Sequence, residues 1–231
     1  MKEQSMDERS IREVIREELK KLKGMTWGQR LGYIWDYYKP LMAAILAVIL
    51  VISIVVSIYR NMQINHLLNV YFVNCNSAEL DAQAITDDFA EYIGGIGAKD
   101  EILLDTSTIL DAEDTSQYSM ASQMKFTAVV AAGDVDVAIF DSEQYEKYRD
   151  GYGLEDLSKV LSEEQLSRWE NALAYGKDEE TGKEIPVALD VQKASLMEQS
   201  NAYNGEKVYA VVMVNSSHTD MSAKFLEYLM Q

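Results

Sequence analysis

The sequence predicts an α/β protein with an N-terminal amphipathic helix, one transmembrane helix, and a single-lobe, mostly parallel sheet flanked by helices. Three observations support this: one long apolar run, alternating strand-like and helix-like segments after it, and a change of charge between the two parts. Residues 1–59 hold nine Lys or Arg and seven acids, a net charge of +2. Residues 60–231 hold 12 bases and 31 acids, a net charge of −19. The sign changes at the apolar run, which therefore divides the chain into two compartments.

Residues 1–24 predict a short amphipathic helix. Ser5 and Glu8 have the spacing of a capping box, and Gly24 is suited to end the helix. Apolar residues recur between them at helical intervals, at Ile11, Val14, Ile15, Leu19 and Leu22. Two interpretations stay open: the helix rests on the membrane or on its own neighbours, or it binds a partner or a second copy.

Residues 25–40 form an aromatic segment directly before the apolar run. Its aromatic residues are Trp27, Tyr33, Trp35, Tyr37 and Tyr38. Amphipathic rings favour the headgroup layer of a membrane, and Lys39 is long enough to reach it. We therefore expect an interfacial helix here, and Pro40 in the first turn of the helix that follows.

The apolar run covers residues 41–59 and predicts a transmembrane helix. It carries no charge, and Ser53 and Ser57 are its only polar members. A helix of this length spans roughly 28 Å, close to the ~30 Å hydrocarbon core of a bilayer. A buried core helix would keep a polar face, and a cleaved signal peptide would not follow about forty other residues. We therefore expect an uncleaved anchor.

The basic residues around the run predict its orientation. Lys20, Lys21, Lys23, Arg30 and Lys39 precede it, whereas Arg60 is the only base close behind it. The positive-inside rule then places the N-terminus in the cytoplasm and the C-terminal domain outside the plasma membrane. Residues 60–66 are interpreted as a stalk, and residues 67–231 as one extracytoplasmic domain.

Residues 67–231 alternate between strand-like and helix-like segments. Expected strands cover residues 67–73, 101–105, 136–140 and 207–214, with a hairpin of residues 172–175 and 184–189. Expected helices cover residues 79–93, 115–132, 142–149, 162–173 and 220–230, and Ser162 with Gln165 has capping-box spacing. Because helices separate most of the strands, we expect a largely parallel sheet covered on both faces.

Composition excludes several classes of function. The acidic surplus of the outer domain argues against nucleic acid, because phosphate binding needs clustered bases. One cysteine, Cys75, excludes an intrachain disulfide framework; it is interpreted as a buried thiol or, alternatively, as half of an intermolecular disulfide. His66 and His218 offer little for a metal site, and a pair of Ser216 or Ser217 with His218 has no defined geometry. We expect no metal, no cofactor and no enzymatic activity.

Small polar residues follow the expected strands and are the candidate ligand-binding residues. In open α/β sheets, ligands bind beyond the carboxyl ends of the strands. Asp141 and Asp190 are the strongest candidates, because a carboxylate at a strand end is less routine than a hydroxyl or an amide. The same residue types are also common helix caps and turn formers. The full set is Asn74, Asn76, Thr106, Asp141, Asp190 and Asn215.

Four segments of the outer domain share a recognisable pattern. Residues 125–140, KFTAVVAAGDVDVAIF, join a helix to a strand through Gly133 and Asp134. Residues 151–157 place glycines before Asp-Leu, residues 183–187 hold a strand with a Pro, and residues 214–229 carry Ala-Lys-Phe-Leu near their end, similar to a family segment that ends in Ala-x-x-Phe-Leu. These segments resemble extracellular solute-binding proteins of ABC importers, where a Pro usually stands in place of Val135. The anchor resembles single-pass bacterial membrane proteins that carry such outer domains.

The resemblance covers residues 120–231, and residues 67–119 by order of elements alone. It implies a fold with two lobes that close around a ligand, but the 165 residues from 67 to 231 suffice for one lobe. One lobe cannot bury most of a ligand's surface. Two functions therefore stay open. The domain is a membrane-anchored accessory or sensor that binds a small polar ligand and an ABC permease, or it recruits envelope proteins without a small ligand.

Overall fold

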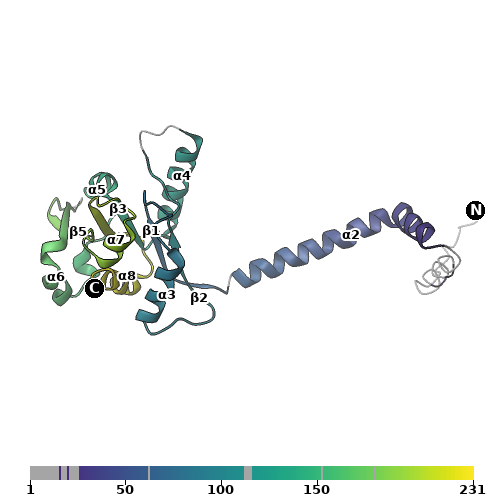
Figure 1. Cartoon of the computed structure of the whole chain (residues 1–231), viewed down its shortest axis with the longest axis horizontal. Helices are drawn as coiled ribbons and strands as arrows, with labels where there is room; N and C mark the ends of the chain where they lie inside the picture. Colours follow the sequence, from purple (N-terminus) through teal and green to yellow (C-terminus); the bar gives the residue numbers. More distant parts are fainter. Residues whose placement is uncertain are drawn as a thin grey trace, which may run out of the picture. The chain divides into compact units, whose positions relative to one another are not determined.

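The computed structural model describes residues 16, 20, 26–61, 63–111, 116–151, 153–178 and 181–231. The chain divides into two units, residues 1–62 and 63–231, which are described separately (Figure 1). The amphipathic helix expected over residues 1–24 lies outside the described residues, apart from Arg16 and Lys20.

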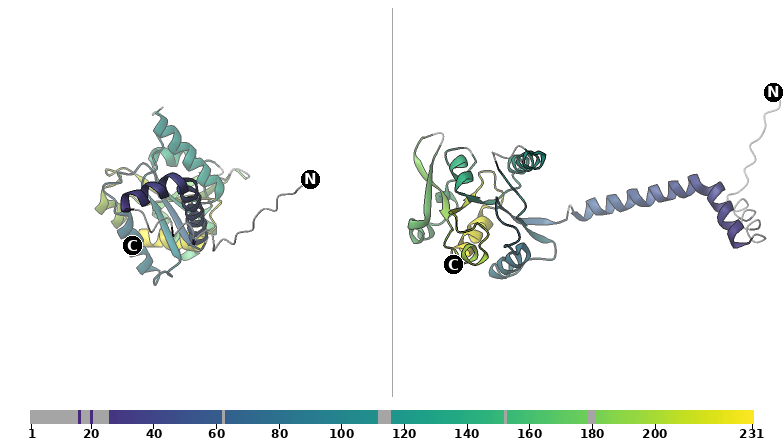
Figure 2. Two further views of the ribbon diagram at one scale, coloured as in Figure 1. Left: turned by 90° about the vertical axis from the view of Figure 1, so that its right-hand side faces the viewer. Right: turned by 45° about the horizontal axis from the view of Figure 1, so that its top comes forward.

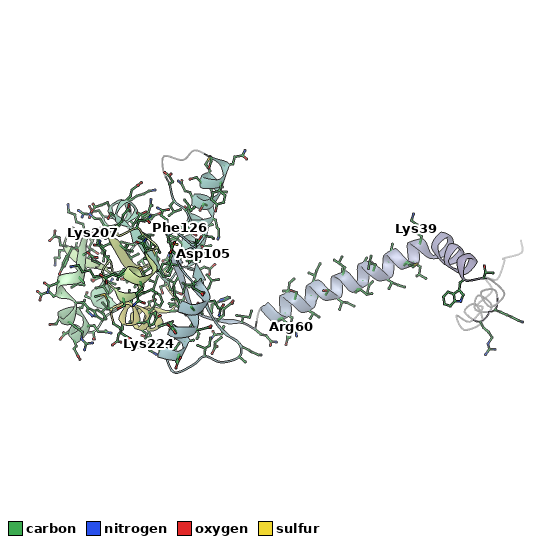
Figure 3. All side chains as sticks on the ribbon, in the orientation of Figure 1. Lys39, Arg60, Asp105, Phe126, Lys207 and Lys224 are labelled. Carbon is green, nitrogen blue, oxygen red and sulfur yellow. The ribbon has the colours of Figure 1, made fainter. Side chains whose placement is uncertain are left out.

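Among its described residues, the first unit contains one long helix, α2 (Trp27–Asn61), of 35 residues. Its stretch Leu41–Arg60 has a mean hydropathy of 3.1, and none of it is buried in the chain. In Figure 3 its side chains project outward between the labelled Lys39 and Arg60. By length and composition, this stretch is suited to cross a membrane.

The aromatic segment and the apolar run belong to a single helix. We expected Pro40 in the first turn of a new helix, but α2 begins at Trp27 and continues through Pro40. A proline inside a helix removes one backbone hydrogen bond and bends the helix. Accordingly, α2 bends close to Lys39 in Figure 3.

The second unit is built on one six-stranded sheet. Its strands are β1 (Asn65–Phe72), β2 (Asp100–Asp105), β3 (Val137–Asp141), β4 (Leu173–Lys177), β5 (Glu184–Asp190) and β6 (Val208–Val212), in the order β2-β1-β3-β6-β5-β4. β1 pairs in parallel with β2 and β3, whereas β6 runs antiparallel between β3 and β5, and β4 antiparallel to β5. Four strands thus share one direction, but the sheet is mixed.

Helices connect the strands, and most begin at the polar residues that the sequence offers as caps. They are α3 (Ala82–Tyr92), α4 (Gln117–Ala132), α5 (Ser142–Tyr148), α6 (Glu163–Arg168), α7 (Ser195–Ser200) and α8 (Thr219–Leu229), with the 3-10 turns η1 (Leu157–Lys159) and η2 (Glu170–Ala172). Ser162 and Gln165 form the predicted capping box, and Gly133 ends α4 in the left-handed conformation.

The core lies on both faces of the sheet, as the alternation of side chains along β1 shows. Val70 and Phe72 face the cluster that includes Phe89 of α3 and Phe225 of α8. Tyr71 faces the opposite cluster, which α4 and α5 cover. The second unit is therefore a three-layer α/β/α structure (Figure 2).

Several elements differ from the prediction in their bounds, direction or presence. The stalk is shorter than residues 60–66, because α2 extends to Asn61 and β1 starts at Asn65. The helix expected over 162–173 ends at Arg168, since η2 and β4 follow it. β6 was expected to be parallel, and α7 was not predicted.

Candidate functional site

Five of the six predicted residues lie at the carboxyl edge of the forward strands. Asn74 and Asn76 follow β1, Thr106 follows β2, and Asp141 and Asp190 end β3 and β5. In register, Asp141 is opposite Val208 and Asp190 is opposite Tyr209, so the two aspartates flank the start of β6. Two strand spacings, roughly 10 Å, separate their backbones.

Asn74 and Asp141 hydrogen-bond to each other. The Nδ2 of Asn74 lies 2.6 Å from Oδ2 of Asp141 and donates to it. The Oδ1 of Asn74 accepts a hydrogen bond of 2.6 Å from the backbone N–H of Leu110. Asn74 has a φ of 57°, in the left-handed region that Asn tolerates better than most residues. Its side chain therefore ties the loop after β2 to the end of β3.

Asp141 and Gln144 complete this network. Oδ1 of Asp141 accepts from the backbone N–H of Gln144 over 2.8 Å and so caps α5. The fully buried Gln144 donates through Nε2 to the carbonyl of Leu110 over 2.7 Å. Most of these polar groups, which a ligand would otherwise use, are thus engaged in holding three loops together; the buried Oε1 of Gln144 has no hydrogen-bond partner among the described residues. We call this cluster of Asn74, Leu110, Asp141 and Gln144 the edge network.

Asn76, Thr106 and Cys75 have structural contacts at the same edge. The exposed Asn76 accepts from the backbone N–H of Ala78 over 3.3 Å. Thr106 offers its carbonyl to Sγ of Cys75 at 3.5 Å. Burial raises the pKa of the Cys75 thiol to about 11, which favours the interpretation as a protonated, partly buried thiol.

Asp190 lies apart from the edge network and lines a cavity of about 350 Å³. Oδ1 of Asp190 accepts from the backbone N–H of Gln192 over 3.1 Å. Lys193 and Ala194 line the same cavity, together with residues from the end of α8. Of the two aspartates that the sequence favoured, Asp190 therefore has open space beside it, whereas Asp141 is bound within the network.

The position predicted for Asn215 was wrong. The prediction assumed a parallel strand over residues 207–214, which would bring Asn215 to the carboxyl edge. Because β6 is antiparallel to β3, Asn215 lies at the opposite edge of the sheet. Its backbone oxygen is close to Gly133, in the turn that precedes β3.

A buried carboxylate, Asp136, lies at that opposite edge, at the first residue of the strand that the sequence predicted over residues 136–140. Asp136 is 0% exposed. It accepts hydrogen bonds from the backbone N–H of Asn69 at 2.8 Å and from Oγ of Ser216 at 2.6 Å. Nδ1 of His218 lies 3.0 Å from its Oδ2. Its place before the apolar strand 137–140 was the signal that could have identified it.

The contacts of Asp136 are structural in kind. In a catalytic triad the histidine lies between the acid and the nucleophile. Here Ser216 and His218 both contact the carboxylate directly, and Ser216 donates to it. The cluster therefore joins the loop before α8 to the start of β3. Among the described residues, no group of three His, Cys, Asp or Glu side chains is placed to hold a metal ion.

Comparison of the chain with protein-family models, curated proteins and solved structures gives no match.

Proposed function

We propose that this protein is a membrane-anchored interaction module, which presents an acidic α/β head outside the cell membrane and recruits protein partners there. The observation that carries this proposal is the edge network. Where the sequence predicted a shelf for a polar ligand, Asn74 and Asp141 bond to each other and to the loop at Leu110. An edge filled in this way favours contact with protein over capture of a solute.

The anchor in this proposal is the stretch Leu41–Arg60, with residues 1–40 in the cytoplasm and the head outside. The charges on either side support this orientation. A head with 31 acids and 12 bases is repelled by anionic lipid, while the bases before the span are attracted to it.

The orientation is tested by labelling single cysteines in intact cells. In a Cys75→Ser chain, Lys183→Cys lies in an exposed loop of the head and Lys39→Cys lies before the span. A maleimide that does not cross membranes is expected to label Lys183→Cys in intact cells, and Lys39→Cys only after lysis. The reverse pattern would contradict the proposal.

A second candidate function is suggested by Asp190. The cavity beside Asp190, of about 350 Å³, is large enough for a small polar molecule. Lys193 lines the same cavity and supplies a positive charge beside the negative charge of Asp190. In this alternative, the head is a sensor or accessory of an ABC permease, as the resemblance to solute-binding proteins implies.

Thermal unfolding of the full chain in nanodiscs separates the two functions. We expect amino acids, sugars and short peptides to leave the midpoint unchanged. A solute that raises the midpoint, and loses this effect in Asp190→Asn, would favour the second function.

Cross-linking in native membranes is the positive test: a covalent protein adduct of the head supports the interaction module, and an ABC permease as the adduct supports the transport role.

A further inference from the structure

Helix α4 is almost free of charge in a strongly acidic domain. Lys125 is the only charged residue among its 16 residues, and no acid occurs between Ser116 and Gly133. Lys125 is itself paired with Asp105 over 2.9 Å. The helix therefore presents a nearly neutral surface on a head whose remaining surface carries the acidic surplus.

The two sides of α4 differ in what covers them. On the inner side, Phe126 is buried, and its ring contacts Tyr71 and Phe140 at centroid distances of 5.9 and 6.2 Å. On the outer side, Met120 and Met124 are 57% and 73% exposed. In Figures 1 and 2, no described element lies over this outer side. The outer stripe consists of Met120, Ala121, Met124, Thr127, Ala128 and Ala131, all exposed.

Helical spacing places the outer stripe on one face. Positions 120, 124, 128 and 131 differ by four, four and three residues, which keeps them on one side of a helix. Apart from Thr127 the outer stripe is apolar, and the apolar face of a helix is normally buried against another surface. The described chain covers only half of α4, so the other half is available to another surface.

We propose that a second copy of this chain covers the outer stripe, with α4 packed antiparallel on α4 around a two-fold axis. This inference rests on the proposed function, because it makes another copy the first protein that the head contacts. The stripe is complementary to itself: its first half carries the large Met120 and Met124, and its second half the small Ala128 and Ala131. An antiparallel pair sets large side chains against small ones at both ends.

Charge favours a second copy over other occupants. A basic partner needs acids on the contact face, and an anionic membrane needs free bases; the outer stripe has neither. Two copies that met through any acidic part of the head would bring like charges together. Contact through α4 keeps those charges apart from the interface.

The small area of the outer stripe explains why pairing would depend on the membrane anchor. A helix face about 24 Å long and about 10 Å wide offers roughly 240 Å², well below the ~800 Å² per partner of a standard stable interface. Such a contact is weak in solution. Confinement of both copies to one membrane raises their effective concentration, which supports pairing through a small contact.

Disulfide cross-linking of the full chain in native membranes tests the pair. In a Cys75→Ser background, single cysteines are placed by Met124→Cys or Ala128→Cys, with Glu91→Cys, exposed on α3, as the matched control. On mild oxidation we expect a dimer band several-fold stronger from the two α4 positions than from the control. Equal bands, or no band from either α4 position, would overturn the proposal.

The salt dependence of cross-linking and the mass of the cross-linked product distinguish a second copy from other occupants of the outer stripe. Screening weakens repulsion between acidic heads, so the yield of the dimer should rise with ionic strength. A yield that falls with salt, or an adduct whose mass is not twice that of the chain, indicates a different protein and overturns self-pairing while leaving the proposed function intact. An environment-sensitive dye on Met124→Cys that reports lipid overturns both.

Charge exchange provides a final test, which does not depend on oxidation. In the antiparallel pair, position 124 of one copy faces positions 127 and 128 of the other. Energy transfer between labelled full-length copies in vesicles should fall in Met124→Glu. It should recover when Met124→Glu copies are mixed with Ala128→Lys copies. Absence of recovery contradicts the antiparallel register.

Discussion

The side-chain amide of Asn74 donates to Oδ2 of Asp141 over 2.6 Å and so joins the ends of the neighbouring parallel strands β1 and β3. The other amide atom, Oδ1, accepts from the backbone of Leu110. One side chain thus satisfies groups on two loops that are distant in sequence. This arrangement makes Asn74 important for stability, whether or not the edge contacts a partner.

Asn74→Ala is expected to lower the free energy of unfolding by about 2–4 kcal/mol. It removes the hydrogen bonds that Asn74 makes to the N–H of Leu110 and to Oδ2 of Asp141, and forces Ala into the left-handed region. Asn74→Gly keeps the backbone relaxed and should recover about 1 kcal/mol of this loss. Denaturant unfolding of the full chain in micelles measures both. The control is the exposed Asn76→Ala, expected within about 0.5 kcal/mol of wild type; an equal loss there would contradict this account.

Asp136→Ala is expected to destabilise the head by about 2–4 kcal/mol. The carboxylate is fully buried and accepts from Asn69, Ser216 and His218, so its removal leaves partly buried donors unsatisfied. Asp134→Ala, two residues earlier and exposed, is the matched control and should change the midpoint little. The two variants are compared by thermal melting. Similar losses from both would indicate a general effect of charge.

Cys75 is expected to react slowly with thiol reagents. Burial raises the pKa of its thiol to about 11, so almost none of the reactive thiolate is present at neutral pH. Alkylation of the folded protein by iodoacetamide should speed up as pH rises from 7 toward 10. Unfolding in urea exposes the thiol, so alkylation in urea should be much faster than alkylation of the folded protein at the same pH. The alkylation rate of an exposed cysteine, introduced as Glu91→Cys in a Cys75→Ser chain, provides the reference. Equal rates for the two thiols at neutral pH would refute the burial argument.

The pair of Asp105 and Lys125 is expected to make stability sensitive to acid. Burial alone would raise the pKa of the Asp105 carboxyl, but hydrogen bonds from Lys125 and Ser107 outweigh burial and hold this pKa below its usual value. A carboxyl whose pKa is lower in the folded state stabilises the protein above its unfolded pKa, about 3.9, and loses this contribution as pH falls further.

Asp105→Asn should therefore be less stable than wild type at pH 7, and the difference should be smaller at a pH below about 3.9. Urea unfolding of the full chain at the two pH values measures this. Asp134→Asn, at an exposed position, is the control and should show little difference at either pH. A difference for Asp105→Asn that stays constant with pH would exclude the ion pair as its cause.

Much of the fold could be predicted from local patterns. The apolar run, the strands and the helix boundaries at Gly133 and Ser162 follow from hydropathy, periodicity and capping, which depend on residues close in sequence. The charge difference between residues 1–59 and 60–231 likewise requires only counting. The sequence did not show that the span is part of one longer helix. Proline is common in the first turn of a helix and rare in its interior, so Pro40 was expected to start a new helix.

The candidate site depended on strand direction, which no local pattern reports. Asp141 and Asp190 reach the predicted edge because β3 and β5 share one direction, whereas Asn215 lies at the other edge because β6 runs the opposite way. The sequence by itself determined the apolar span and most of the strands and helices, but not α7 or the end of α6. Only the tertiary structure decided that Asn74 bonds to Asp141 and that Asp136 is buried beside His218, since both contacts join residues more than sixty positions apart.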